Sequence, residues 1–307
     1  MARLTGQNPP VTDGRAFQRR LAGTPPEALF LVSAIAQYVG AAIAVTLFDE
    51  VEPQTVAWLR VIGAALAVLA VSRGWRSGWT RRQLLGVAVF GIATALMNVF
   101  FYLGIERIDL GKGVTIEFIG PIAVAAFSTR SGRNAVALLF AFVGVVVLGG
   151  VEIDDNLTGL VFILSASAMW AAYIVIGARV AQVDRGVAGL GLGLAIGAVV
   201  VTPIGAPWSG DVWLDPRLLG LCLLVGVFSN AIGYGIDQFT MRRIPVRRFS
   251  LLLALLPVTA ALVGWIGLGQ QPSGIDLVGI ALVLVGVSVQ ERDRIDRVEA
   301  VVRTDPA

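Results

Sequence analysis

The chain has 307 residues, of which 56% are hydrophobic and only 15% are charged, and it carries a formal net charge of +3. Soluble globular proteins contain about 25% charged residues, so this composition indicates a membrane protein and leaves no room for a large soluble domain. Histidine is absent and Cys222 is the single cysteine, which excludes disulfides, zinc sites built on His and Cys, and nucleophile pairs that need histidine.

A hydrophilic stretch opens the chain and ten apolar segments follow it. Residues 1–27 contain arginines and prolines but no apolar core, which predicts a disordered cytoplasmic tail rather than a cleavable signal peptide. The apolar segments lie at 28–48, 55–71, 84–104, 113–128, 134–150, 158–178, 188–205, 217–236, 247–268 and 274–290, and a polar tail, 291–307, closes the chain. Because about 20 apolar residues cross a bilayer, we predict an all-α integral membrane protein with ten transmembrane helices.

Basic residues gather on one side of this arrangement. Most of the 24 Lys and Arg residues fall in the two tails and in the loops after the second, fourth, sixth and eighth segments. The opposite loops are acidic around Asp49, Glu152 and Asp211. The positive-inside rule therefore places both termini in the cytoplasm. The positive net charge follows from this topology, so no nucleic-acid partner is expected.

The two halves of the chain resemble each other. Residues 102–127 align with 238–263, which places Ile108 over Ile244 and Pro121 over Pro257. Each half, 28–150 and 151–290, holds five segments, and an odd number requires the second half to enter the membrane upside down. Inverted repeats are typical of secondary transporters, with the substrate site near the repeat interface. A duplication retained for packing alone is the alternative.

Three ionisable residues lie inside or at the end of the apolar segments. Arg60 and Glu117 lie at similar depth from the predicted outer face, so we expect them to make contact, and such residues mark functional sites in membranes. A purely structural ion pair is the alternative. Asp237 lies at the cytoplasmic end of the eighth segment, where it either belongs to a gate or is a solvated helix end.

Two prolines occupy matching positions in the halves. Pro121 has no N–H to bond the carbonyl of Glu117, and Pro257 leaves the carbonyl of Leu253 in the same situation. A freed carbonyl beside the Glu117 carboxyl predicts an acceptor site for an ammonium group or a proton. The alternative is a simple kink that neighbouring helices satisfy.

Polar and aromatic residues in the apolar segments are weaker candidates for the lining of a cavity. Each can equally serve as an interhelical hydrogen-bonding or membrane-interface residue. They are Gln37, Tyr38, Asn98, Tyr102, Trp170, Tyr173, Asn230 and Tyr234. Gly189, Gly193 and Gly197 recur at four-residue spacing and predict a face for close helix packing.

Several stretches resemble a known family. They are WLRVIG (58–63), MNVFFYLGIERIDLGKGVTIEFIGPIAVAAFSTR (97–130) and SAMWAAYIVIGARVA (167–181). With the duplicated ten-segment layout, they resemble the threonine/homoserine exporter branch of the drug/metabolite transporter superfamily, which has two EamA-type repeats. The resemblance implies an inner-membrane exporter of amino acids or similar small metabolites that is driven by a proton gradient.

The same resemblance bears on individual positions. Positions that look alike in that branch are Arg60, Glu117, Pro121, Trp170, Tyr173 and Asp237, with Asp237 standing where a Glu is usual. Two positions depart from it, because Leu256 precedes Pro257 where the branch tends to have Glu, and Gln270 stands where it has a further Glu.

The leading hypothesis is a secondary exporter that works by alternating access between the halves. Arg60 holds a substrate carboxylate, while Glu117 holds its ammonium group or exchanges with a proton. Residues predicted to complete the substrate site are Asn98, Tyr102, Trp170 and Tyr173, and those predicted to act in coupling or gating are Glu117, Asp237, Pro121 and Pro257. The partners are thus a small molecule, a proton and the lipid bilayer, with no cofactor or metal.

Two other classes compete with this hypothesis. A membrane-embedded enzyme acting on lipids needs clustered carboxylates for Mg²⁺ or histidine motifs, and the chain lacks these. A non-catalytic scaffold has no reason to retain Arg60 and Glu117 inside the bilayer. The oligomeric state and the identity of the solute are not indicated by the sequence.

Overall fold

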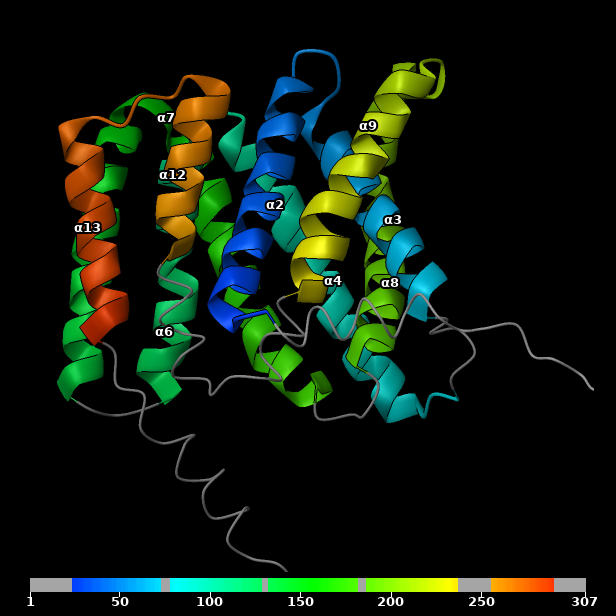
Figure 1. The fold of residues 1–307 in the computed structure, drawn as a ribbon, viewed down its shortest axis with the longest axis horizontal. Helices are drawn as coiled ribbons and strands as arrows, with labels where there is room; N and C mark the ends of the chain where they lie inside the picture. The colour runs from blue at the N-terminus through cyan, green and yellow to red at the C-terminus, as the bar shows by residue number, and fades with distance from the viewer. Residues whose placement is uncertain (1–23, 73–77, 129–131, 182–185, 237–254, 290–307) are drawn as a thin grey trace, which may run out of the picture.

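The computed structural model describes residues 24–72, 78–128, 132–181, 186–236 and 255–289. In these ranges the regular elements are helices, which lie side by side along a common direction (Figure 1). They are α2 (Pro26–Thr46), α3 (Pro53–Ser72), α4 (Arg81–Ile105), α5 (Leu110–Glu117), α6 (Ile119–Ser128), α7 (Gly132–Ala181), α8 (Gly186–Gly205), α9 (Pro216–Gly226), α12 (Leu255–Leu268) and α13 (Gly274–Val289). Two short 3₁₀ turns, η2 (Ala206–Trp208) and η3 (Asp211–Trp213), link α8 to α9.

Each of the ten predicted apolar segments overlaps a described helix. The fifth and sixth segments share α7, whose backbone leaves the helical conformation at Asn156. The fourth segment is divided into α5 and α6, and the first part of the ninth, 247–254, lies outside the described residues. Six described helices are long and apolar enough to cross a membrane, and three more are apolar but shorter. The chain is therefore a multi-pass membrane protein, while the count of ten spans and the cytoplasmic termini stay predictions.

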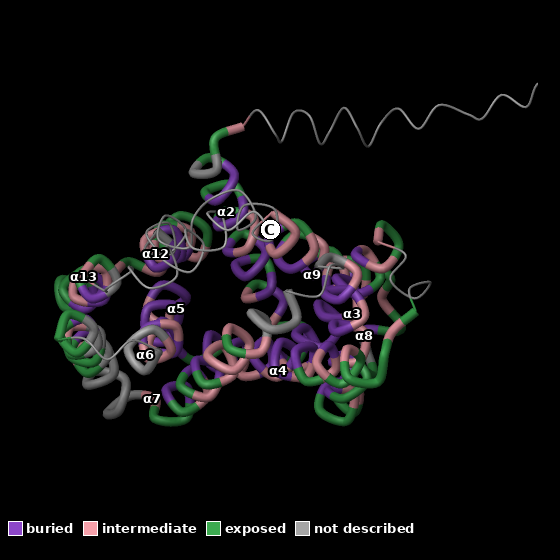
Figure 2. The backbone as a smooth tube through the Cα atoms, turned by 90° about the horizontal axis from the view of Figure 1, so that it is seen from below, coloured by how far each residue is buried: buried purple, intermediate pink, exposed green. Residues whose placement is uncertain are grey.

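The helices form two groups. In Figure 2, α3, α4, α8 and α9 lie together at one end, and α5, α6, α12 and α13 lie at the other, with α2 between α12 and α9. The long α7 packs against α6 and α13 and also against α4. In the predicted repeat, α3 and α8 are the second helices of their halves, and α4 and α9 are the third helices. The contacts follow an exchange of these helices, because α3 packs against α9, α8 packs against α4, and α3 and α8 pack against each other. This pattern fits an exchange of two similar halves, while their opposite orientation in the membrane stays a prediction.

Glycines allow the helices of the first group to approach closely. A side chain on Gly91 of α4 would collide with the carbonyl of Gly193 in α8, and one on Gly197 would collide with the carbonyl of Gly91. The small-residue face predicted from Gly193 and Gly197 is thus confirmed. A second close approach joins α3 to α9, where a side chain on Gly226 would collide with the backbone carbonyl of Arg60.

The last turns of the α9 helix widen into a π-helix, η4 (Val227–Gly233). Asp215 caps the start of α9 by accepting hydrogen bonds from the backbone N–H groups of Arg217 and Leu218, at 2.8 and 3.3 Å. A π-helix inserts an extra residue into the turn and often marks a functional site. Here it turns Ser229 and Asn230 into the protein interior, where both are fully buried.

Candidate functional site

Arg60 is a buried cation in the middle of the first helix group. Its side chain belongs to α3 and only 5% of the residue is exposed. The close approach of α9 at Gly226 brings the π-helix alongside it. As a result, the Nε of Arg60 donates a hydrogen bond of 2.8 Å to the side-chain oxygen of Asn230.

The hydrogen bonds continue from Asn230 into α4. The Nδ2 of Asn230 donates to the Oδ1 of Asn98 at 3.5 Å, and the Nδ2 of Asn98 donates to the backbone carbonyl of Thr94 at 2.7 Å. We call Arg60, Asn230, Asn98 and Thr94 the amide relay. It links α3, η4 and α4 inside the protein, and each of its members is buried.

Tyr102 covers one face of the guanidinium. The Cζ of Arg60 lies 4.8 Å from the centre of the Tyr102 ring, which is a cation–π contact, and Tyr102 itself is fully buried. The ring of Phe48 packs edge-on against that of Tyr102, with 5.7 Å between the ring centres. The Tyr102 hydroxyl approaches the guanidinium, but neither it nor the Nη1 of Arg60 completes a hydrogen bond of good geometry with a described residue.

Glu117 is the buried anion, and it lies where the fourth segment breaks. It ends α5, Phe118 is a turn residue, and α6 begins at Ile119. Pro121 accounts for the break, because it lacks the N–H that would bond the Glu117 carbonyl. The residue is 8% exposed, and its carboxylate makes no hydrogen bond with a described residue.

The expected contact between Arg60 and Glu117 is not a direct ion pair. Neither residue takes part in any of the ion pairs among the described residues. Both are buried, and Tyr102, which covers Arg60, and Phe118, which follows Glu117, belong to the same buried hydrophobic cluster. Arg60 instead uses its Nε for Asn230. Neither charge is therefore neutralised by an ion pair among the described residues.

Trp170 and Tyr173 lie one helical turn apart on α7 and face this region. The Trp170 ring packs edge-on against Phe118 at 5.1 Å, so it contacts the break beside Glu117. Tyr173 packs on Phe90 of α4 at 4.8 Å and on Tyr234, just after the π-helix, at 6.3 Å. The two aromatic residues thus connect the Glu117 break with the helices that carry the amide relay.

The remaining predicted residues have different outcomes. Asp237 lies outside the described residues, as does Leu253. Pro257 is buried near the start of α12, which packs against α5. Asn230 plays a larger part in the site than the sequence indicates. From the sequence alone, an uncharged amide in an apolar segment looks like any residue that forms a hydrogen bond between helices. Only the fold shows that it is the partner of Arg60.

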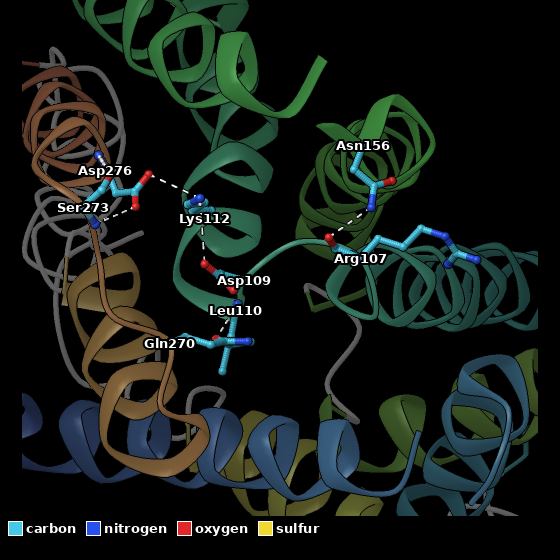
Figure 3. A network of polar contacts seen from close by, with 8 residues as sticks. All are labelled: Arg107, Asp109, Leu110, Lys112, Asn156, Gln270, Ser273 and Asp276. Carbon is cyan, nitrogen blue, oxygen red and sulfur yellow. Dashed lines mark hydrogen bonds and ion pairs between the residues drawn. The ribbon is translucent and has the colours of Figure 1, made fainter. Parts of the chain in front are cut away.

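A second polar cluster lies at the helix ends predicted to face outside (Figure 3). The Nζ of Lys112 in α5 lies 3.5 Å from the carboxylate of Asp276 in α13 and 3.8 Å from that of Asp109. Gln270, in the loop between α12 and α13, accepts a 3.0 Å hydrogen bond from the backbone N–H of Leu110. These contacts fasten α5 of the first half to the α12–α13 turn of the second.

Comparison with known proteins supports a common origin. The EamA-like transporter family matches residues 157–290. The threonine/homoserine exporter RhtA of Salmonella typhimurium is 33% identical over 269 residues, which cover 87% of this chain and 91% of that protein. The RhtA of Escherichia coli K12 is also 33% identical, covering 84% and 88%.

A solved crystal structure resembles the fold with a TM-score of 0.60 at 20% identity, covering 87% of this chain and 98% of that one. At such low identity the likeness concerns the fold alone. The match to the exporters spans both halves, including the segments that carry Arg60 and Glu117. The chain therefore belongs to the EamA-like transporter family, within the drug/metabolite transporter superfamily, and is a membrane transporter rather than an enzyme.

Proposed function

We propose that the protein exports amino acids of the threonine/homoserine kind across the inner membrane, by alternating access and in exchange for protons. The relatives that match along most of their length carry the name threonine/homoserine exporter. The similarity supports a small metabolite as substrate. The buried groups of this chain favour one with both a carboxylate and an ammonium group.

The observation that carries the proposal is a pair of opposite charges that do not neutralise each other directly. A buried charge without a close partner costs several kcal/mol, so such groups persist where a ligand uses them. Arg60 keeps its Nη1 without a protein acceptor among the described residues, and Glu117 keeps its carboxylate without a protein donor among them. An amino acid presents a carboxylate to the first and an ammonium group to the second.

The surrounding residues suit these two roles. A substrate carboxylate can accept hydrogen bonds from the Nη1 of Arg60 and from the hydroxyl of Tyr102, both buried donors. The ammonium group can donate to the Glu117 carboxylate and to the carbonyl that Pro121 leaves without a helical partner. Trp170, which contacts Phe118 at the break, then lies beside the remainder of the substrate together with Tyr173.

Proton exchange follows from the same carboxylate. With no histidine in the chain, a carboxyl group must carry a proton near neutral pH. Glu117 cannot hold a proton and the substrate ammonium at once, so binding of one displaces the other. This competition is the minimum that coupled antiport requires. Asp237, at the predicted cytoplasmic end, is the candidate for the inner end of the proton path.

Transport into proteoliposomes tests the proposal. Purified protein is reconstituted, labelled threonine is supplied, and a pH gradient is imposed in either direction. We expect threonine movement against the proton flux, and loss of that movement in Arg60→Met and in Glu117→Gln. A folded protein that moves no amino acid, or whose Arg60 and Glu117 variants transport normally, contradicts the proposal. Transport that ignores the pH gradient contradicts the proton coupling alone.

A further inference from the structure

We propose that Asn230 is a positioning residue that holds the guanidinium of Arg60 in the orientation needed to bind the substrate carboxylate. The inference rests on the proposed function, because it assigns Asn230 a role in the recognition that Arg60 performs. Asn230 is fully buried and its Oδ1 accepts the Nε hydrogen bond of Arg60 at 2.8 Å.

The contacts of Arg60 leave one part of the guanidinium for a ligand. The planar group offers donors along its edges, and two parallel hydrogen bonds to a carboxylate need one edge correctly placed. Asn230 occupies the Nε, and the Tyr102 ring covers one face. The terminal nitrogens remain, of which Nη1 is buried and has no acceptor among the described residues. A carboxylate must therefore approach the terminal edge.

The amide relay determines which way Asn230 points. Asn98 donates its Nδ2 to the backbone carbonyl of Thr94, so its Oδ1 is turned toward Asn230 as an acceptor. Asn230 must then present its own Nδ2 to Asn98, which turns its Oδ1 toward Arg60. If the amide of Asn230 were flipped, its Nδ2 would face the Nε of Arg60, and both atoms are hydrogen-bond donors. The backbone carbonyl of Thr94 thus sets the orientation of both amides, and Asn98 acts through Asn230.

The backbone around Asn230 is fastened to α2. The Oγ of Ser33 donates to the carbonyl of Gly233 at 2.9 Å, and the Oγ of Ser229 donates to the carbonyl of Gln37 at 3.2 Å. A side chain on Gly40 would collide with Ser229, so α2 lies directly against the π-helix. The wide turn therefore carries Asn230 at a fixed place, as the positioning of a long, flexible arginine requires.

The alternative is that Asn230 only satisfies a buried cation and so supports the fold. The two roles differ in their dependence on the substrate carboxylate. A positioning role affects ligands that carry a carboxylate and spares ligands that lack it. A structural role weakens the binding of both alike, or lowers the amount of folded protein.

Competition in proteoliposomes separates these roles. Counterflow of labelled threonine is inhibited by unlabelled threonine or by threoninol, in which a CH₂OH group replaces the carboxylate. In Asn230→Leu, of similar size, we expect KM and the inhibition constant for threonine to rise about tenfold or more, the effect of a charge-assisted hydrogen bond. The maximal rate and the inhibition constant of threoninol should change little. Asn230→Asp, which places a carboxylate against the guanidinium of Arg60, should also weaken the binding of threonine but not that of threoninol.

Two controls identify the source of a failure. Thr55→Val removes a buried hydrogen bond of 2.7 Å between α3 and the carbonyl of Gly205 without touching Arg60 or Asn230, so it should retain wild-type preference for threonine over threoninol. Arg60→Met should abolish that preference. If it does not, the proposed function fails. Suppose instead that Arg60→Met abolishes the preference for threonine. If both Asn230 variants then keep this preference, or weaken the binding of threonine and threoninol equally, Asn230 has no positioning role.

Discussion

Arg60 and Glu117 are buried in one helix bundle and form no ion pair with each other. Arg60 turns its Nε to Asn230 and its face to Tyr102, while Glu117 ends α5 at the break before Pro121. Two buried opposite charges that are kept apart resemble a receptor for a zwitterion more than a structural pair, because a structural pair gains its stability from direct contact. The following prediction tests this distinction.

The first prediction concerns the double variant of Arg60 and Glu117. Arg60→Met and Glu117→Gln should each reduce threonine export at least about a hundredfold, since each removes one charged end of the recognition. Because the two residues form no ion pair, the double variant should not recover the stability that the two single variants lose. Melting temperatures in detergent and export in proteoliposomes measure the two effects. An active double variant, or one that recovers the stability lost in both single variants, indicates a structural pair.

The sequence predicts much of this fold, for identifiable physical reasons. Long apolar segments bounded by charged loops leave little choice but membrane helices, and all ten segments overlap described helices. Pro121 predicts the break at Phe118 because the missing N–H is a local property of proline. Gly193 and Gly197 predict close packing because their spacing places them on one helix face.

The amide relay could not be predicted in the same way. Asn230 meets Arg60 across 170 positions of the chain, and a π-helix turns it inward. Neither the widened turn nor the pairing leaves a periodic pattern in the sequence. Depth along the helices predicts that Arg60 and Glu117 lie at the same level, but depth says nothing of their separation within the membrane plane. That separation decides between an ion pair and two available charges.

The second prediction tests the close packing of α4 on α8. Gly91→Val should destabilise the protein by about 3 kcal/mol or more, because its side chain would collide with the backbone of Gly193. The matched control is Gly220→Ala, where an added methyl group meets no other atom within 4 Å, so its stability should be unchanged. Thermal unfolding in detergent measures both. A Gly91→Val protein as stable as the wild type contradicts the described helix contact.

The third prediction concerns the break in the fourth segment. Pro121→Ala supplies the N–H that the Glu117 carbonyl lacks, so it should join α5 and α6 into one helix and raise stability by about 1 kcal/mol. Transport should nevertheless slow, because the freed carbonyl no longer serves the substrate. Unfolding and export are measured together. A variant that is more stable and equally active assigns Pro121 to a simple kink.

The fourth prediction addresses orientation in the membrane. Reporter fusions after residue 130 and after residue 248 should report the cytoplasm, whereas a fusion near Asp154 should report the outside. The expectation follows from the arginines that gather in alternate loops. A cytoplasmic signal at Asp154 removes both the count of ten spans and the inverted repeat.

The last prediction concerns the ion pair between Lys112 and Asp276, which joins the two halves at the helix ends predicted to face outside (Figure 3). Asp276 is 3% exposed and also caps α13 by accepting a 2.8 Å hydrogen bond from the N–H of Ser273. Lys112→Met should leave this buried carboxylate without its cation and destabilise the junction of α5 with α13 by about 1–3 kcal/mol. The expected results are a lower melting temperature and faster modification of a cysteine that replaces the fully buried Leu110 in a Cys222→Ser background. Gln270→Glu is the control, since its side chain can still accept the hydrogen bond of the Leu110 N–H and so keeps this contact between the halves. If Lys112→Met changes neither stability nor the modification rate, the ion pair does not hold α5 and α13 together.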